Sequence, residues 1–437
     1  MVCEWKKTTV GEISDRVTKG TTPTTLGRCF VERGINFIKV ESLAEDGRIL
    51  PDKLAHIDAV TDEMLSRSRL ERGDILFTIA GTIGRAALVP KWLLPANTNQ
   101  AIAIVRPKRG VIEPRFLYYV LRDESRVKHA RTRVVQSVQA NFSLGELSSL
   151  ELTLPSLAEQ KAIVAVLGAL DDKIELNRRM NATLEAMARA LFQSWFEGFD
   201  PVRAKLDGRK PEGLDEATTD LFPDSFQDSE LGHIPTGWTV GRVADVSDFS
   251  RSSINPIEFP DEIFDHYSLP AFDEGQIPKA ENGSTIMSNK LIMTQKCVLL
   301  SKLNPHIPRI WLPELHVTRR SVCSTEFIVA SARPGYSCEF LFSLFTCAAF
   351  ATTYGSLVTG TTGSHQRVRP ESVLEMHTVI PPPKLVKAFT AIAEPIFQQI
   401  NRNIDQSRTL ASLRDTLLPK LLSGELSVDK IKEGLVA

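Results

Sequence analysis

Along residues 163–191, apolar residues recur at alternating spacings of four and three, a heptad pattern that predicts one long helix lying along another. Two asparagines, Asn177 and Asn181, stand near the middle of this apolar seam. The same pattern returns 226 positions later, where Asn403 matches Asn177. The predicted seam positions are Ile163, Leu167, Leu170, Ile174, Asn177, Asn181, Leu184 and Leu191 in the first helix, and Phe389, Ile396, Ile400, Asn403, Leu410 and Leu417 in the second.

Two helices related by an internal repeat can pack antiparallel about a pseudo-two-fold axis, where seam residues near the axis meet their counterparts. We therefore expect Asn177 and Asn181 to meet Asn403 and Ser407 across the pair. A buried asparagine lowers stability but penalises registers in which its amide faces only aliphatic groups. The alternative is a solvated edge at which the helices splay apart.

The segments before the helices also repeat. Short β-type apolar runs separated by Gly- and Pro-containing turns predict strands, and residues 73–78 correspond to residues 296–301. The predicted fold class is α+β: two globular mixed α/β domains alternate with two long helices that pair as an antiparallel coiled coil, in a pseudo-two-fold internal repeat. The expected divisions are a first domain (1–154), first long helix (155–198), connector (199–236), second domain (237–380), second long helix (381–424) and C-terminal tail (425–437).

Composition narrows the class of protein. With 42% hydrophobic and 24% charged residues among 437, the chain has material for several buried cores. The uncharged run Phe340–Val358 contains Ser, Thr, Tyr and Gly, which favours a buried core segment over a membrane span. The N-terminus has no apolar leader, so we expect no secretory signal. We therefore expect a cytoplasmic location. The six cysteines form no CxxC pair, which favours reduced thiols over a metal site or disulfides.

Charge is unevenly distributed although the net charge is −1. Eleven basic residues face three acidic ones between Arg85 and Arg133, and six face one between Lys290 and Arg320. Such zones are compatible with contacts to phosphate, although runs of this kind are more often solvated surface.

No complete catalytic motif is present: the chain lacks an adenine-methyltransferase [N/D]PPY loop, a GxxxxGK[ST] loop and an HExxH pair. Two glycine-containing loops, Gly81–Arg85 and Gly360–Ser364, lack the lysine that a triphosphate would need. Their backbone N–H groups could meet phosphate instead, and ordinary tight turns are an equal alternative. We therefore expect no enzymatic activity, no cofactor and no metal in this chain.

Reading a DNA sequence requires side chains with paired donors and acceptors, chiefly Arg, Lys, Asn and Gln. Polarity and loop position select the following candidates. In the first domain they are Lys19, Thr21, Thr22, Lys39, Thr82, Arg85, Asn97, Asn99, Gln100, Arg133, Gln136, Gln139 and Asn141. In the second domain they are Arg251, Ser252, Asn255, Lys302, Asn304, His306, Arg309, Arg319, Thr361, Thr362, Ser364, His365, Gln366 and Arg367.

The chain resembles the specificity subunit of type I restriction–modification systems over nearly its whole length. Five segments carry the resemblance together: Leu154–Phe196, Phe199–Leu214, Leu221–Phe226, Leu231–Trp238 and Leu413–Leu426. The resemblance implies that each globular unit is a target recognition domain that reads one half of a bipartite DNA sequence. It also implies that the helices form a spacer and dock two adenine methyltransferase subunits, which a motor–nuclease subunit joins. Those partners would use S-adenosylmethionine, ATP and Mg²⁺.

One departure from the family pattern concerns the start of the second helix. Glu159 and Gln160 fit the pattern, but Leu385 and Val386 occupy the equivalent positions, so the two docking surfaces need not be equivalent. Three other functions stay open: a coiled-coil scaffold that binds proteins, a nucleotide-dependent enzyme using the glycine loops, and the equivalent subunit of a related system with fused methyltransferase–nuclease partners.

Overall fold

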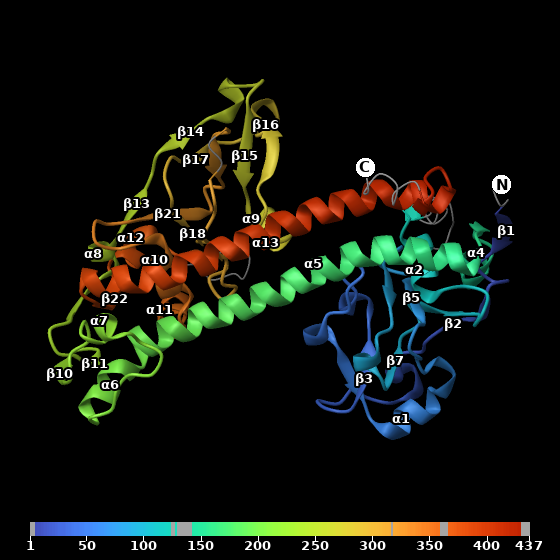
Figure 1. The fold of residues 1–437 in the computed structure, drawn as a ribbon, viewed down its shortest axis with the longest axis horizontal. Coiled ribbons are helices and arrows are strands. Elements are labelled where there is room, and N and C mark those ends of the chain that lie inside the picture. The colour runs from blue at the N-terminus through green and yellow to red at the C-terminus, as the bar shows by residue number, and fades with distance from the viewer. Residues whose placement is uncertain (1–4, 124–126, 129–141, 316–317, 359–365, 430–437) are drawn as a thin grey trace. The chain divides into compact units, whose positions relative to one another are not determined.

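The computed structural model describes residues 5–123, 127–128, 142–315, 318–358 and 366–429. The chain divides into two compact units, which are described separately (Figure 1). The first unit comprises Met1–Leu176 and Gln406–Ala437, and the second comprises Asn177–Asp405. Helices α5 (Leu157–Phe192) and α13 (Pro383–Ser423) each contribute one part to each unit.

Three sheets build the first unit. An antiparallel four-stranded sheet has the order β2-β8-β5-β6, a three-stranded sheet has the order β4-β3-β7, and β1 pairs with β9. The pairing of β3 with β7 is parallel. The elements are β1 (Lys6–Thr9), β2 (Ser14–Lys19), β3 (Ile35–Ile38), β4 (Ala55–Ile57), α1 (Ala59–Met64), β5 (Ile75–Thr78), β6 (Ala86–Leu88), β7 (Ala96–Thr98), β8 (Ile102–Pro107), α2 (Pro114–Arg122), α4 (Leu144–Ser148) and β9 (Glu151–Leu154).

The second unit repeats this plan. Its four-stranded sheet has the order β13-β21-β18-β19, its five-stranded sheet β14-β17-β20-β15-β16, and β12 pairs with β22. The elements before α10 are α6 (Asp200–Leu206), α7 (Glu216–Thr219), β10 (Phe226–Ser229), β11 (Gly232–Pro235), β12 (Thr239–Arg242), α8 (Val243–Val246), β13 (Ser247–Ser250), β14 (Ser253–Ile254), β15 (Ile263–Tyr267), α9 (Leu269–Asp273), β16 (Lys279–Asn282), β17 (Lys290–Met293), β18 (Val298–Ser301), β19 (Ile310–Trp311), β20 (Ser321–Cys323) and β21 (Phe327–Ala332). They are followed by α10 (Cys338–Thr346), α11 (Ala348–Ser356), α12 (Pro370–Leu374) and β22 (His377–Ile380).

The strand orders confirm the internal repeat. The strands β2, β8, β5 and β6 correspond in order to β13, β21, β18 and β19, and the parallel pair β3–β7 corresponds to β15–β20. All four residues of β5 and of β18 are buried. Central strands covered on both faces require continuous apolar runs, and this is why both segments could be recognised as strands from the sequence.

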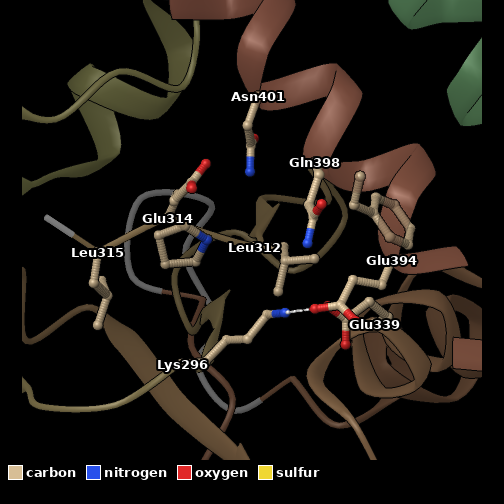
Figure 2. A pocket seen from close by; sticks show the side chains of 10 residues that line it. Lys296, Leu312, Glu314, Leu315, Glu339, Glu394, Gln398 and Asn401 are labelled. Atoms are coloured by element: carbon tan, nitrogen blue, oxygen red, sulfur yellow. Dashed lines mark hydrogen bonds and ion pairs between the residues drawn. The ribbon is translucent and has the colours of Figure 1, made fainter. Parts of the chain in front are cut away.

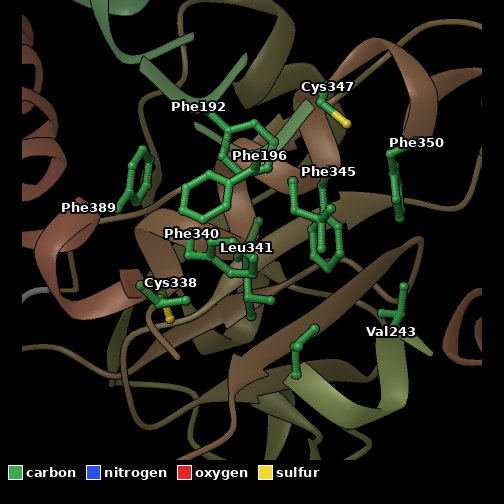
Figure 3. Close-up of a cluster of buried hydrophobic side chains, with 14 of the residues drawn as sticks. Phe192, Phe196, Val243, Cys338, Phe340, Leu341, Phe345, Cys347, Phe350 and Phe389 are labelled. Atoms are coloured by element: carbon green, nitrogen blue, oxygen red, sulfur yellow. The ribbon is translucent and has the colours of Figure 1, made fainter. Parts of the chain in front are cut away.

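The connector is folded. Its helices α6 and α7 and the hairpin β10–β11 place Phe199, Val202, Phe222 and Ile234 in the main core of the second unit. In the same core, Figure 3 shows Phe192 and Phe196 of the α5 end beside Phe340, Leu341 and Phe345 of α10. Low apolar periodicity therefore hid a segment that contributes single large residues to a shared core.

The uncharged run that begins at Phe340 forms α10 and α11, and most of α10 is buried in this same core, as expected. Within the part of the chain that the structure describes, no helix is both long enough and apolar enough to cross a membrane.

The long helices pack against each other within each unit, with opposite directions. In the first unit, Ile163 and Leu167 share a core with Leu418 and Leu421. In the second unit, Phe192 of α5 lies against Phe389 of α13, with ring centroids 5.9 Å apart. All predicted seam positions are buried or half-buried. The second helix was expected over residues 381–424; α13 continues through Pro419 to Ser423, and Gly424, whose φ is 76°, follows its last residue.

The asparagines of the seam meet across the pair, as expected. The side-chain Nδ2 of Asn403 donates to Oδ1 of Asn181 at 2.7 Å, and Nδ2 of Asn181 donates to the carbonyl of Ile400 at 3.2 Å. Asn177, which is fully buried, donates to the carbonyl of Asn403 at 3.4 Å. These bonds exist in only one alignment of the helices; whether they select that alignment stays a prediction.

Candidate nucleic-acid interface

Five of the predicted residues gather at one edge of the first domain, where β2 ends and β8 begins. Lys19 is the last residue of β2, and Thr21 and Thr22 follow it. The hydroxyl of Thr22 donates to the side chain of Gln100, and the side chain of Asn99 accepts the N–H of Ala101 at 3.1 Å. We call Lys19, Thr21, Thr22, Asn99 and Gln100 the β2–β8 cluster.

Gly20 makes this gathering possible. A Cβ atom at Gly20 would lie 1.8 Å from the carbonyl oxygen of Thr98, so only glycine lets the two segments approach this closely. The backbone N–H of Gly20 also donates to the carbonyl of Asn99 at 3.1 Å.

Two basic residues beside this cluster were missed. The guanidinium of Arg67 reaches the carbonyl of Lys19 at 3.5 Å, and that of Arg16 reaches the carbonyl of Arg67 at 3.2 Å. Both side chains are exposed. Neither lies in the basic zones of the sequence, and only the fold brings them beside Lys19, so linear charge counting could not find them.

Several other first-domain candidates are held inside the domain. Asn97 is 0% exposed and bonds to Asp62, Ser68 and the carbonyl of Leu65, so its side chain has a structural role inside the domain. Arg85 donates to the carbonyl of Leu43 at 2.8 Å and lies 3.3 Å from Glu45. Its guanidinium therefore links the turn after β5 to the segment of Leu43 and Glu45.

The remaining two described candidates of the first domain also have local roles. The ammonium of Lys39 lies over the ring of Phe30, 4.3 Å from the centroid. Thr82 is exposed, but its carbonyl accepts the hydroxyl of Thr78 at 2.5 Å, which closes the turn after β5. In this turn Gly81 and Gly84 have φ values of 72° and 93°, so the left-handed backbone explains the glycines by itself.

In the second domain, two distant segments come together. The N–H of Asn304 donates to the carbonyl of Gln366 at 3.0 Å, and the N–H of Val368 donates to the carbonyl of Lys302 at 3.0 Å. His306 lies in the same loop and is exposed. We call Lys302, Asn304, His306 and Gln366 the β18-loop cluster.

The candidate arginines of the second domain are paired with acids. Arg309 makes a bidentate pair with Asp273 at 2.7 and 2.9 Å, and Arg367 makes one with Glu326 at 3.0 Å for both bonds. The hydrogen bonds from Arg367 lower the pKa of Glu326, and those to Asp273 raise the pKa of Arg309. Each guanidinium therefore stays protonated, and the carboxylate paired with it offsets its positive charge.

Pairing with acids also holds for two other candidate arginines, Arg251 and Arg319, of which only Arg319 lies in the second basic zone. Arg251 pairs with Glu371 at 2.5 Å and Arg319 with Asp265 at 3.2 Å, while Ser252 is exposed and Asn255 donates to Glu258 at 3.1 Å. This zone is far less positive than the sequence indicates, because acids distant in sequence offset its charges. The predicted residues Arg133, Gln136, Gln139, Asn141, Thr361, Thr362, Ser364 and His365 lie outside the described residues.

A pocket of about 280 Å³ lies in the second unit between α13 and the segment after β19 (Figure 2). Its polar wall contains Lys296, which pairs with the buried Glu339 and, at 3.2 Å, with Glu394. Burial alone would lower the pKa of Lys296, but these two carboxylates raise it. Among the described residues, no group of three His, Cys, Asp or Glu side chains could hold a metal ion. In this pocket, the ion pairs link Lys296 to Glu339 of α10 and to Glu394 of α13.

Comparison with known proteins finds similarity to one kind of protein. Residues 3–186 match the family model described as the type I restriction modification DNA specificity domain. The chain is 23% identical to the type I restriction enzyme HindI specificity subunit of Haemophilus influenzae, over 97% of this chain and 100% of that relative. It is 25% identical to the MjaIX specificity subunit of Methanocaldococcus jannaschii, over 82% and 79% of the two chains.

The chain is similar to type I specificity subunits over most of its length. The fold agrees with that similarity. A crystal structure of the type I S subunit from M. genitalium superimposes with a TM-score of 0.54 at 14% identity, covering 96% of each chain. This likeness supports the same fold, with mixed helices and strands joined to long helices.

Proposed function

We propose that this chain is a specificity subunit that recognises a DNA sequence. Each recognition domain reads one half of a bipartite target, and the paired helices set the separation of the halves. In this proposal the chain performs no catalytic step and binds no cofactor. The observation that carries it is the repeated topology, in which two units with matching four-stranded sheets each contain one part of α5 and one part of α13.

The β2–β8 cluster and the β18-loop cluster are the proposed reading surfaces. Each combines a lysine with amide side chains, which offer the donors and acceptors needed at base edges and phosphates. In the first domain, Arg16 and Arg67 extend the cluster with positive charge. Arg85, Arg309 and Arg367 are proposed to order these loops and not to contact bases.

Partners complete the proposed activity. Two adenine methyltransferase subunits would dock on the helices and use S-adenosylmethionine, and motor–nuclease subunits using ATP and Mg²⁺ would join them. Because methylating an adenine requires the base to leave the duplex, this chain would hold the duplex in register while a partner provides the pocket. The proposed location is the cytoplasm, where the cell's DNA would be accessible.

Sequencing the methylome of a strain that expresses this chain with its methyltransferase is the direct test. The expected result is methylation at two half-sites separated by a constant number of base pairs. Methylation at a single continuous motif, or none above the strain lacking this chain, would contradict the proposal. Footprinting of the assembled complex separates DNA reading from a protein-binding scaffold, which would protect no defined sequence.

A second experiment tests the spacer. Inserting one heptad at matched levels of α5 and α13 lengthens the pair by about 10 Å. At about 3.4 Å per base pair, the preferred spacer should then grow by about three base pairs. If the folded variant kept the same preferred DNA spacer, the length of the helices would not set the separation of the half-sites.

Residue variants test the reading surfaces. Lys19→Ala should weaken binding to all sequences alike and reduce the salt dependence by about one unit of slope. Gln100→Ala should relax specificity at one position of the first half-site. Lys53→Ala, at an exposed lysine of the same domain that is not among the predicted DNA contacts, is the matched control and should change neither quantity.

A further inference from the structure

In the first unit, one carboxylate links three elements. Asp171 of α5 accepts the hydroxyl of Tyr119 of α2 at 2.7 Å through Oδ2. Its other oxygen, Oδ1, accepts Nη1 of Arg414 of α13 at 2.8 Å. The bridge is largely shielded from water, because the side chains of Arg414 and Asp171 are 11% and 18% exposed and Tyr119 is fully buried.

The helix α2 makes this bridge relevant to the recognition domain. Tyr119 lies in a core with Ile75 and Phe77 of β5 and Ala86 of β6, so α2 is packed on the central sheet of the domain. A second contact supports the orientation of α2: Arg115 donates to Asp172 at 2.8 Å and to the carbonyl of Gly168 at 3.3 Å. Directional polar bonds therefore connect α2, α5 and α13, and apolar packing connects α2 to the sheet.

Arg414 stands at a seam position of α13, where the heptad pattern favours an apolar residue. Placing a guanidinium there carries a desolvation cost that a well-packed apolar residue would avoid. Burial alone would lower the pKa of Arg414, but hydrogen bonds and charges from Asp171 and Asp415 raise it, so the guanidinium stays charged. Buried polar groups of this kind are best attested as devices that fix register.

The repeat provides an internal comparison. The positions equivalent to Asp171 and Arg414 are Phe397 and Ala188 in the second unit. Phe397 packs on Phe342 of α10 with ring centroids 5.2 Å apart, and Phe397 and Ala188 belong to the same apolar core, so packing at this level does not depend on an ion pair between these two positions. The ion pair of the first unit must then supply something that apolar packing does not, and directional geometry is the property that distinguishes the two.

We propose that Arg414 is a positioning residue: through Asp171 and Tyr119 it fixes how the first recognition domain is oriented on the helix pair of its own unit. This inference rests on the proposed DNA-addressing function and adds to it the residue that aligns one reading surface. Loss of the bridge should leave the domain folded but let its orientation vary, so that targets with altered spacers become acceptable.

The test uses the assembled complex and DNA carrying the methylome-defined target with its normal spacer, or with the spacer changed by one base pair. Arg414→Met keeps the side-chain length and removes the bridge. The expected result is a loss of about 10-fold in discrimination against the altered spacers, which corresponds to one charged hydrogen bond. Arg414→Lys, which can still reach Asp171, should restore part of that discrimination.

Arg408→Met is the matched control, because Arg408 is an exposed arginine on the same helix. Wild-type discrimination in folded Arg414→Met, or equal relaxation in Arg408→Met, would overturn the inference. Should Arg414→Met fail to fold, Tyr119→Phe removes only the α2 hydroxyl, and unchanged discrimination in that variant overturns it as well. Failure of the wild-type complex to methylate a bipartite target would instead reject the proposed function, so the two outcomes are distinguishable.

Discussion

The two junctions between a recognition domain and the long helices have the same topology but different chemistry. In the first unit, the side chain of Gln160 accepts the N–H of Glu113 at 2.8 Å and donates to the carbonyls of Pro155 and Val111 at 2.9 and 3.3 Å. One fully buried amide thus ties the start of α5 to the start of α2.

In the second unit, Val386 occupies the position of Gln160 and is buried among apolar side chains. The start of α10 is capped by Ser337, whose hydroxyl accepts the N–H of Phe340 at 3.1 Å and bonds to Thr390 at 2.8 Å. The departure at Leu385 and Val386 is therefore compensated locally. The comparison indicates that duplication preserved the arrangement of elements while the joints diverged into a polar and an apolar solution.

The largest expected effect comes from truncating the apolar junction. Phe389 lies against Phe192, Trp195 and Phe196, with ring centroids 5.9, 6.2 and 5.3 Å away. Phe389→Ala should lower the unfolding free energy by about 3–5 kcal/mol, because it leaves a cavity within an aromatic cluster. Hydrogen exchange resolved by peptide should place the loss in the second unit.

The equivalent position in the first unit is Ile163, so Ile163→Ala is the matched variant. It should cost about 2–4 kcal/mol and affect exchange in the first unit. If Ile163→Ala lost more unfolding free energy than Phe389→Ala, the expected greater dependence of the second-unit junction on apolar packing would be contradicted.

Exchanging the junction residues should give the next largest effect. Gln160→Val leaves the N–H of Glu113 and two carbonyls without their side-chain partner, at a cost of about 2–3 kcal/mol. Val386→Gln buries a side-chain amide among apolar side chains, at a cost of about 1–3 kcal/mol. Denaturant unfolding of both variants measures these costs. Neutral behaviour of either exchange would mean that the two joints are interchangeable.

Replacing the polar layer of the helix pair should act in the opposite direction. The double variant Asn177→Leu, Asn403→Leu removes buried amides and should raise the melting temperature by several degrees, as expected for about 1–2 kcal/mol. It should also blur the register or the oligomeric state, which light scattering and cross-linking would detect. A variant that is less stable and otherwise unchanged would contradict the register hypothesis.

Local and periodic features could be predicted from the sequence, whereas pairing across long sequence distances could not. The heptad seam follows from the spacing of apolar residues, and the buried strands β5 and β18 follow from continuous apolar runs. The burial of Asn97 and the pairing of Arg309 with Asp273 depend on which segments the fold brings together. For the same reason, the sequence overstated the positive charge of the second domain and missed Arg67.

The smallest expected effect concerns pH and the second unit. Burial lowers the pKa of His266 below its usual value of 6.5, although Glu281 at 2.6 Å acts to raise it. Well above pH 6.5 the residue is neutral in both the folded and unfolded states and contributes no pH dependence. Below pH 6.5 the unfolded chain binds a proton more readily, so the unfolding free energy should fall as pH drops through this range. His266→Gln should reduce that slope when urea unfolding is compared at pH 7 and pH 5. An identical slope in the variant would mean that other groups cause the acid sensitivity of this unit.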